Sequence, residues 1–241
     1  TEFDLSVGMT YRYPIRARDA PGNLGPYSAI ATATFGSSAP TTGLVAAYNF
    51  DEGSGTTVND SSGLNNTGVI SGATWTTGKY SQALNFDGVN DYVTIGDVDF
   101  PGSFTLSMWA KANNLSSGCH GSVVMKRYDY GFEVCNGVLY GKVGKGVGPG
   151  WAASTKYTIP QAGVWNYYAL TYDGTTARLY VNGNQVSTAT GTHSTNNNPL
   201  MIGTWDRSSE FFSGAIDEVH LYSRALSASQ LQADMNTAVT P

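Results

Sequence analysis

The fold is decided near the end of the chain, where residues 214–226 read GAIDEVHLYSRAL. Side chains alternate between the two faces of a β-strand. Asp217 has the parity of Val219 and Leu221, so the pattern predicts a strand whose carboxylate faces the core beside these two apolar side chains. A carboxylate in such a place must be paired, hydrogen-bonded or bound to a cation. We therefore expect a last strand that closes against an earlier part of the sheet.

The expected partner of this strand lies far upstream. Residues 44–51 read LVAAYNFD and also end on an acid, Asp51. If the two strands pair, Asp51 and Asp217 lie close together, and two acids repel unless a cation or another partner neutralises them. The sequence thus predicts that the first and last strands of one domain lie side by side.

The composition is typical of a turn-rich, all-β extracellular protein. Charged residues make up 13% of the 241 residues, and the chain contains 29 glycines and 15 tyrosines. A net charge of −5 argues against nucleic acid and against an anionic membrane surface, which both require clustered Lys and Arg. No apolar run approaches the roughly 20 residues of a membrane span. No signal peptide is recognisable, so we expect a mature chain or a part of a larger protein.

The chain has two cysteines, Cys119 and Cys135. Because the composition is that of a secreted protein and the pair brackets a predicted hairpin, a disulfide is favoured over two free thiols. Metal binding by this pair is disfavoured, because only His120 lies nearby.

Residues 44–236 contain about a dozen short apolar segments, separated by Gly, Asn and Asp turns at the spacing of a β-sandwich. Clear examples are residues 82–86, 91–95, 104–110, 166–172 and 177–181. Asp173-Gly174 and Asn182-Gly183 are strong hairpin signals. Ser227 is the expected N-cap of a short helix over residues 227–233.

Residues 1–36 resemble the last strands of a fibronectin type III domain. The matching motifs are GMTYRY at 8–13, RARDAPGN at 16–23 and PYS at 26–28. The resemblance covers only the C-terminal half of that sandwich, and two or three strands alone are marginally stable. We therefore expect another chain or the main domain to cover the open edges. By composition, residues 37–43 are a linker and residues 237–241 a tail.

An ordered set of motifs in residues 44–236 resembles the laminin-G-like, concanavalin A-like lectin/glucanase family. The motifs are AYNFDEGSG at 47–55, DSSG at 60–63, ALNFDG at 83–88, DYV at 91–93, Trp165, LTYDG at 170–174, LYVNG at 179–183, IG at 202–203 and IDEV at 216–219. The resemblance implies an all-β fold, a jelly-roll sandwich of two curved antiparallel sheets. It also implies carbohydrate binding and a structural calcium ion in many members.

Calcium takes six to eight oxygen ligands from carboxylates, amides and carbonyls. The predicted ligands are Asp51, Asp60, Asn66 and Asp217, because loop 59–66 adds oxygens near the paired strands. The alternative is that Asp60 and the neighbouring asparagines only make hydrogen bonds within a turn. A second acidic cluster, between residues 87 and 99, is interpreted as hairpin turns.

A sugar site needs flat aromatic rings for the apolar face of a pyranose and planar polar groups for its hydroxyls. Three segments offer both: residues 126–130, 205–212 and 147–151. The candidate ligand-binding residues are Trp205, Asp206, Arg207, Tyr128, Tyr130, Arg127 and Trp151. The alternative is that these aromatic residues pack on their own sheet. Alternation places Trp109, Trp165, Phe86 and Phe104 in the core.

Catalytic motifs are scarce. The three histidines lack the spacing of a metal site, and no Gly-x-Ser-x-Gly elbow occurs. Glu133 and Glu210 remain open as a pair of acids for glycoside hydrolysis. The closely spaced Glu-x-Asp-x-x-Glu strand of glycoside hydrolases with the resembled fold is missing.

The sequence therefore predicts a non-catalytic, lectin-like module of a larger secreted protein. Such a module holds an attached enzyme or a cell surface on a polysaccharide or glycan, with calcium fixing the fold. The alternative is a structural or adhesive module, whose fibronectin-like segment engages a neighbouring copy or domain. A glycoside hydrolase or lyase ranks third.

Overall fold

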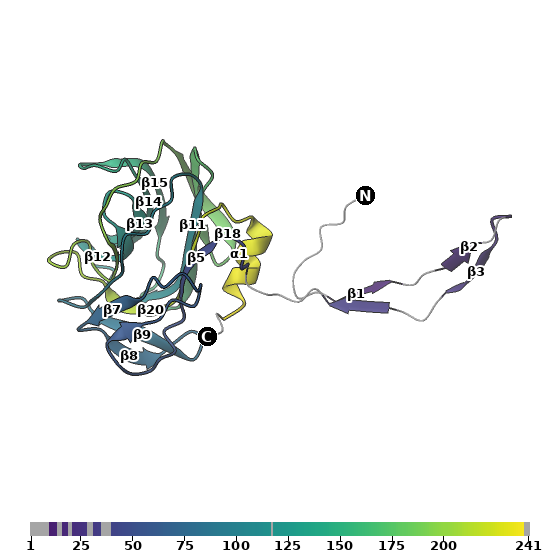
Figure 1. Ribbon diagram of the computed structural model, residues 1–241, viewed down its shortest axis with the longest axis horizontal. Coiled ribbons are helices and arrows are strands. Elements are labelled where there is room, and N and C mark those ends of the chain that lie inside the picture. Colours follow the sequence, from purple (N-terminus) through teal and green to yellow (C-terminus); the bar gives the residue numbers. More distant parts are fainter. Residues whose placement is uncertain are drawn as a thin grey trace.

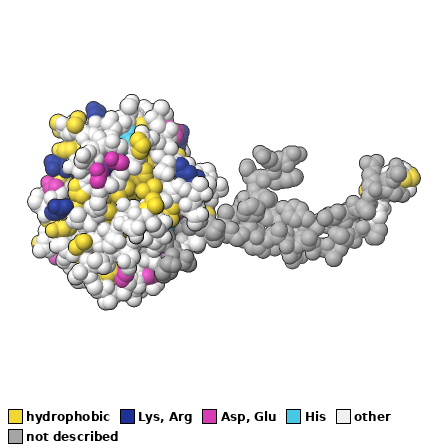
Figure 2. All heavy atoms as spheres, viewed as in Figure 1, with side chains coloured by type: hydrophobic (Ala, Val, Ile, Leu, Met, Phe, Trp, Pro, Cys, Tyr) yellow, Lys and Arg dark blue, Asp and Glu magenta, His cyan; other side chains and the backbone are white. Residues whose placement is uncertain are grey.

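The computed structural model describes residues 10–13, 16–18, 21–27, 31–34, 40–116 and 118–238. Two antiparallel sheets of eight strands each form the body of the molecule (Figure 1). The predicted all-β, two-sheet architecture of a jelly-roll sandwich is confirmed. Hydrophobic side chains show as a band across the body in Figure 2, with polar surface around it.

The first sheet carries the site described below. Its strands, in spatial order, are β15 (Trp151–Thr158), β14 (Val138–Gly144), β13 (Tyr130–Cys135), β12 (Cys119–Lys126), β19 (Leu200–Ile202), β10 (Tyr92–Thr94), β7 (Gly68–Ser71) and β6 (Thr57–Val58). β19 comes from much later in the chain than its neighbours β12 and β10. This insertion brings loops distant in sequence to the same end of the sheet.

The second sheet contains the closing strand pair. Its strands, in spatial order, are β18 (Asn184–Thr190), β17 (Thr176–Val181), β16 (Asn166–Tyr172), β11 (Phe104–Ala112), β20 (Ser213–Tyr222), β9 (Gln82–Asp87) and β8 (Thr74–Thr77), while β5 (Leu44–Tyr48) pairs with the C-terminal part of β20. Val219 of β20 lies opposite Tyr48 of β5, and Leu221 lies opposite Ala46. The predicted pairing of these two strands is confirmed.

The predicted orientation of Asp217 is wrong. A β-bulge interrupts β20, because Trp109 of β11 pairs with Asp217 whereas Ser107 pairs with His220. At the bulge, Glu218 adopts the left-handed conformation with φ 49°. One extra residue reverses the parity of everything before it. The side chain that shares the core with Val219 and Leu221 is therefore that of Ile216, not that of Asp217.

The core consists of two clusters on opposite faces of the second sheet. The larger one fills the space between the sheets and is rich in aromatic rings, such as Phe100, Phe104 and Tyr130. The smaller one includes Trp109 and Leu231 and lies where helix α1 (Ala228–Met235) covers the outer face of this sheet (Figure 1). The predicted N-cap is confirmed, because the side chain of Ser227 accepts a hydrogen bond from the backbone N–H of Gln230.

The N-terminal strands form two separate antiparallel pairs. β1 (Thr10–Tyr13) pairs with β4 (Ala31–Thr34), and β2 (Arg16–Arg18) pairs with β3 (Leu24–Tyr27). Parts of the fibronectin-like motifs, residues 8–9, 19–20 and 28, lie outside the described residues, as do linker residues 37–39. Within the described part of the chain, no helix has the length and apolar character to cross a bilayer.

Candidate functional site

Three connections of the first sheet bring three aromatic rings together. They are the turn between β12 and β13, the loop between β14 and β15, and the loop that follows β19. The ring centroid of Trp205 lies 5.3 Å from that of Tyr128 and 5.8 Å from that of Trp151, both in edge-to-face geometry. We call these three residues the aromatic cluster. All three are among the residues predicted to contact a sugar.

The turn that carries Tyr128 is fixed by its backbone. The N–H of Asp129 donates to the carbonyl of Lys126 at 2.9 Å, and Tyr128 has φ 61°, in the left-handed region. The ring of Tyr128 then lies directly on the backbone of Gly148. A Cβ atom at Gly148 would lie 2.3 Å from Cζ of Tyr128, so only glycine fits there.

The loop that carries Trp205 is held by its own polar side chains. Thr204 Oγ1 donates to the carbonyl of Ser209 and accepts from the backbone N–H of Arg207. Asp206 Oδ1 accepts from the backbone and hydroxyl of Ser208 and from the hydroxyl of Ser209. Burial opposes ionisation, but these hydrogen bonds prevail and hold the pKa of Asp206 below its usual value. The carboxylate of Asp206 therefore fixes the loop.

A cavity of about 210 Å³ lies beside the aromatic cluster. Its lining residues are Arg127, Asn198, Pro199, Met201, Trp205, Asp206 and Arg207. Four of these are predicted ligand residues. The guanidinium carbon of Arg127 lies 4.9 Å from the ring centroid of Tyr128 and 5.6 Å from that of Trp205, so Arg127 connects the cavity with the cluster.

Sequence reasoning missed Asn198, Pro199 and Met201, which also line the cavity. The signal for Asn198 was the run NNNP at residues 196–199. The side-chain amides of Asn196 and Asn198 both donate to the carbonyl of Arg127. These two bonds tie the loop before β19 to the turn after β12.

A buried ion cluster lies under the same turn. Lys126 is fully buried, and its ammonium group contacts the carboxylates of Asp97, Asp99 and Asp129. Burial opposes the charge, but Asp97 and Asp99 prevail and raise the pKa of Lys126 above its usual value. Asp129 also contacts the ring of His193, so its carboxylate connects Lys126 at the end of β12 with the segment before β19. The interpretation of Asp97 and Asp99 as turn formers is therefore incomplete.

The prediction that Tyr130 contacts a ligand is wrong. Tyr130 is 0% exposed, its hydroxyl donates to the carbonyl of Val98, and its ring packs on Phe100 and Phe104. Side chains alternate along β13, so Tyr130 points into the core. Its neighbour Tyr128 lies in the turn before the strand, where alternation does not apply.

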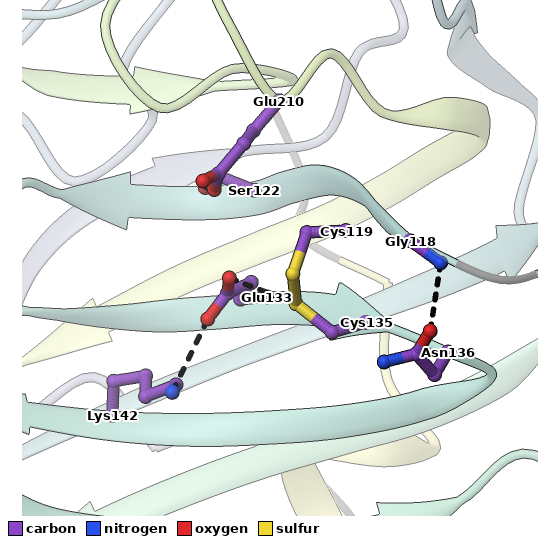
Figure 3. The surroundings of a disulfide bond; sticks show 8 residues. All are labelled: Gly118, Cys119, Ser122, Glu133, Cys135, Asn136, Lys142 and Glu210. Atoms are coloured by element: carbon purple, nitrogen blue, oxygen red, sulfur yellow. Dashed lines mark hydrogen bonds and ion pairs between the residues drawn. A yellow bond between two sulfur atoms is a disulfide. The ribbon is translucent and has the colours of Figure 1, made fainter.

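Beyond Trp151, the outer face of the first sheet carries a charged group around the disulfide. The predicted bond between Cys119 and Cys135 is present and joins β12 to β13 (Figure 3). Glu133 lies next to it and pairs with Lys142 of β14 at 3.2 Å. The ammonium group of Lys142 lies 5.4 Å from the ring centroid of Trp151, so this group continues the site along the sheet.

Glu210 approaches the same group from the loop before β20. Its carboxylate accepts a hydrogen bond from the hydroxyl of Ser122 at 3.4 Å (Figure 3). Burial and, secondly, the charge of Glu133 raise the pKa of Glu210. The two candidate acids for hydrolysis thus lie on one face. Glu133 is tied to Lys142, and Glu210 is tied to Ser122.

The four predicted calcium ligands do not assemble into one site. Asp60 accepts hydrogen bonds from the backbone N–H groups of Ala47, Ser62 and Asn66, and the amide of Asn66 donates to the carbonyl of Val45. Asp60 and Asn66 thus brace their own loop. Among the described residues, the only group of three potential metal ligands is Cys119, Glu133 and Cys135, and its cysteines form the disulfide.

Asp51 and Asp217 both bind the turn between β8 and β9. Asp217 Oδ2 accepts from the backbone N–H groups of Lys79 and Tyr80, and Asp51 Oδ1 accepts from that of Gln82. Burial nevertheless raises the pKa of Asp217 to about 7. The two acids therefore bind the same turn. Its backbone N–H groups stabilise the carboxylates in part, as a bound cation was predicted to do.

A second cavity, of about 160 Å³, fits a cation better than the predicted set. Its lining residues are Asn49, Asp51, Glu52, Asn59 and Ser61, all of which carry side-chain oxygens. Glu52 Oε1 accepts from the backbone N–H of Asn59, whereas its Oε2 is buried and has no hydrogen-bond partner in the part of the chain that the structure describes. A buried, unpartnered carboxylate oxygen is suited to a hard cation such as Ca²⁺. Asp51 alone belongs to both the predicted set and this cavity.

The comparisons agree with this fold. A family model described as the concanavalin A-like lectin/glucanases superfamily matches residues 87–232. No curated protein sequence matches the chain.

Among solved structures, domain 4 of the extracellular arabinanase AbnA from Geobacillus stearothermophilus, in complex with arabinotriose, matches with a TM-score of 0.59 at 20% identity, over 79% of this chain and 97% of that one. The binding domain of Paraclostridial Mosquitocidal Protein 1 gives a TM-score of 0.62 at 16% identity, over 79% and 51%. The botulinum neurotoxin serotype D binding domain gives 0.65 at 13% identity, over 80% and 51%. The chain thus spans about half the length of these two toxin domains, and at such identities the likeness concerns the fold alone.

Proposed function

Because the chain belongs to the concanavalin A-like lectin/glucanase superfamily, we propose that residues 44–236 form a non-catalytic module that binds a polysaccharide or glycan at the aromatic cluster. The observation that carries the proposal is the convergence of Tyr128, Trp151 and Trp205 beside a cavity of about 210 Å³. An aromatic ring covers the apolar face of a pyranose, and nearby arginine and amide groups bind its hydroxyls.

The rings are suited to this role because they are only half-buried. Their mutual contacts are edge-to-face rather than stacked, and all three residues are partly exposed, so aromatic surface remains open to a ligand. Hydrogen bonds from backbone and side-chain groups hold the turn, the cavity wall and the loop after β19, so little conformational entropy is lost on binding. The arabinotriose complex of the arabinanase domain with the same fold supports a sugar ligand.

The module acts in a larger secreted protein. The disulfide between Cys119 and Cys135 supports an oxidising, extracellular setting. The fibronectin-like segment at residues 1–36 and the linker at 37–43 connect the module to neighbouring domains. In such a protein it holds an attached enzyme or a cell surface on its glycan.

A glycan array probed with the whole chain tests the proposal, followed by calorimetry on the best ligand. Trp205→Ala lowers affinity by at least about tenfold, because a central aromatic anchor contributes a large share of binding energy. Trp165→Ala is the matched control, since Trp165 directly precedes β16, packs against the smaller core cluster near Lys111 and does not line the cavity. Equal losses in the two variants, or an array without binding, contradict the proposal.

Calcium is proposed as a structural ion in the cavity of about 160 Å³. Asp51, Glu52 and the side-chain oxygens of Asn49, Asn59 and Ser61 hold it, in place of Asp60, Asn66 and Asp217. The bound ion supplies positive charge to the unpartnered Oε2 of Glu52. This loop lies between β5 and β6, so the ion stabilises the edge of the sandwich and takes no part in chemistry.

The rival function is assembly through the N-terminal segment. β1 and β4 pair with each other, as do β2 and β3, and neither pair joins a larger sheet in the described residues. Open strand edges are suited to accepting a strand from a neighbouring copy or domain. Light scattering over a range of concentrations, on the whole chain and on residues 43–241, separates the two functions. An oligomer that is lost on truncation supports assembly, and an unchanged monomer excludes it.

A further inference from the structure

We infer that the cavity beside the aromatic cluster selects an acidic sugar, by binding its carboxylate between Arg127 and Arg207. This inference rests on the proposed function and names the class of glycan. The chain as a whole is acidic, with a net charge of −5, yet two guanidinium groups line one cavity of about 210 Å³.

The guanidinium of Arg127 is oriented without an ion pair to any described residue. It lies over the rings of Tyr128 and Trp205, and its Nη2 donates to the hydroxyl of Tyr128 across 3.4 Å. Its Nε is buried and has no hydrogen-bond partner among the residues that the structure describes. Within the described ranges, no carboxylate forms an ion pair with Arg127, although Lys126 next to it contacts three. A buried N–H that is left unbonded is costly, so it favours an acceptor from a ligand.

Arg207 approaches the cavity from the loop after β19. Its backbone has φ 69°, and its N–H is fixed by Thr204 Oγ1 at 3.1 Å, so its exposed side chain starts from a held position. No acid of the described chain forms an ion pair with it. The strained backbone at Arg207 thus holds, beside the cavity, a cationic side chain without an ion pair in the described chain.

Asp206, the acid in the cavity wall, forms no ion pair with either arginine, although the charge of Arg127 helps to lower its pKa. Asp206 Oδ1 is committed to Ser208 and Ser209, and its carboxylate is outside ion-pair distance of both guanidinium groups. The carboxylate of Asp206 thus forms hydrogen bonds within its own loop instead of an ion pair with a neighbouring arginine. Two planar donor groups therefore remain for a ligand.

A sugar carboxylate meets the requirements of this cavity. It is planar, and its two oxygens accept parallel hydrogen bonds from a guanidinium. It is attached directly to the pyranose ring, whose apolar face packs on Trp205. A sulfate ester carries the same charge but is tetrahedral, so it matches the planar group less well.

The test measures binding of the whole chain to matched pairs of oligosaccharides by calorimetry. Each pair contains an acidic oligosaccharide and its carboxyl-reduced form, and the pairs cover galacturonate, glucuronate, mannuronate and sialic acid. We expect at least one acidic member to bind about tenfold or more tightly than its reduced form, as for hydrogen bonds to a charged group. Raised salt concentration weakens the acidic member only.

Variants assign the preference to the arginines. Arg207→Gln and Arg127→Gln remove the preference, so that each variant binds the acidic member and the reduced member of a pair with similar affinity. Arg207 is exposed, so its variant keeps the test valid even if Arg127→Gln fails to fold. Arg178→Gln is the matched control, because Arg178 pairs with Asp173 in the second sheet.

The outcomes separate this inference from the proposed function. Equal affinity within every pair overturns the acidic-sugar assignment but leaves glycan binding, if Trp205→Ala still weakens it. A further pair, a sulfated oligosaccharide and its desulfated form, overturns the carboxylate assignment if it alone shows a preference. If no glycan of the array or of the pairs binds, both proposals are rejected.

Discussion

At the scale of single residues, Asp234 forms the centre of a buried network beneath α1. Its carboxylate accepts hydrogen bonds from Ser107, Tyr167 and Tyr222 and contacts the ring of His220 at 2.9 Å. Burial opposes ionisation, but the charge of His220 prevails and lowers the pKa of Asp234 to about 2. Burial likewise opposes the charge of His220, but Asp234 prevails and raises its pKa to about 10.

This network makes stability depend on pH. Because the folded pKa of His220 lies above its unfolded value, its contribution is fully present below pH 6.5 and is lost as the pH rises through about 10. We expect the free energy of unfolding, from urea titrations between pH 7.5 and 10, to fall for the wild type and to change less for His220→Gln. This pH range starts above 7 because the pKa of Asp217 is about 7. Above that pH, Asp217 no longer changes its protonation and no longer affects how stability varies with pH. Parallel profiles for the two proteins contradict this role of His220.

The acid can be tested at a fixed pH. Asp234→Asn is expected to cost about 3–5 kcal/mol at pH 7, since it leaves His220 buried without its main counter-charge. The matched control is Asp173→Asn, on the surface, where a broken ion pair costs only about 0–1 kcal/mol. A similar small loss in both variants contradicts the argument.

At the scale of elements, loops 145–150 and 126–129 fit together through one glycine. Gly148→Ala places a methyl group 2.3 Å from Cζ of Tyr128, so the ring must leave its present position beside Trp205. We expect glycan affinity to fall roughly tenfold. Stability falls by about 1–3 kcal/mol, the usual cost of overpacking.

The control for this loop is Gly102→Ala, which adds its methyl group to open space. Calorimetry with the best glycan and urea titrations compare the two variants. If Gly148→Ala keeps full affinity, the position of Tyr128 does not determine binding.

Element boundaries followed well from local sequence. The hairpin signals Asp173-Gly174 and Asn182-Gly183 lie between β16 and β17 and between β17 and β18, where Asn182 and Gly183 both have positive φ. Such signals are local, because the turn residues themselves supply the required backbone conformations. The bulge in β20 gave no such signal, since Glu218 is not a residue that favours φ 49°.

At the scale of the whole molecule, calcium is expected to stabilise the sandwich. If the ion is present at about 100 times its dissociation constant, binding adds about 2.7 kcal/mol, which corresponds to roughly 5–10 °C in Tm for a domain of this size. EDTA should therefore lower Tm by this amount, and excess Ca²⁺ should restore it.

Glu52→Gln provides the control for the calcium site. Its Tm is expected to lie close to that of the wild type in EDTA and to respond little to chelator, because the unpartnered carboxylate oxygen is gone. A wild-type melting curve that does not change in EDTA removes calcium from this cavity.

By itself, the sequence determined the hairpin turns and the cap of α1, since turn residues and caps act over a few neighbouring positions. The two-sheet architecture, the pairing of β5 with β20 and the disulfide were also predicted, from the ordered motifs, from two segments with similar patterns and from the composition. The sequence also named six residues that the fold brings together: Arg127, Tyr128, Trp151, Trp205, Asp206 and Arg207.

Only the tertiary structure decided which of these loops meet. β19 lies between β12 and β10, so Trp205 comes next to Tyr128 through strand order rather than through sequence distance. It also decided that Ile216 faces the core in place of Asp217, because one extra residue at the bulge reverses alternation, and that Asp60 braces a loop. The physical reason is the same in each case. Strand order, register and the competition of backbone N–H groups for a carboxylate depend on contacts between distant segments, which local patterns do not contain.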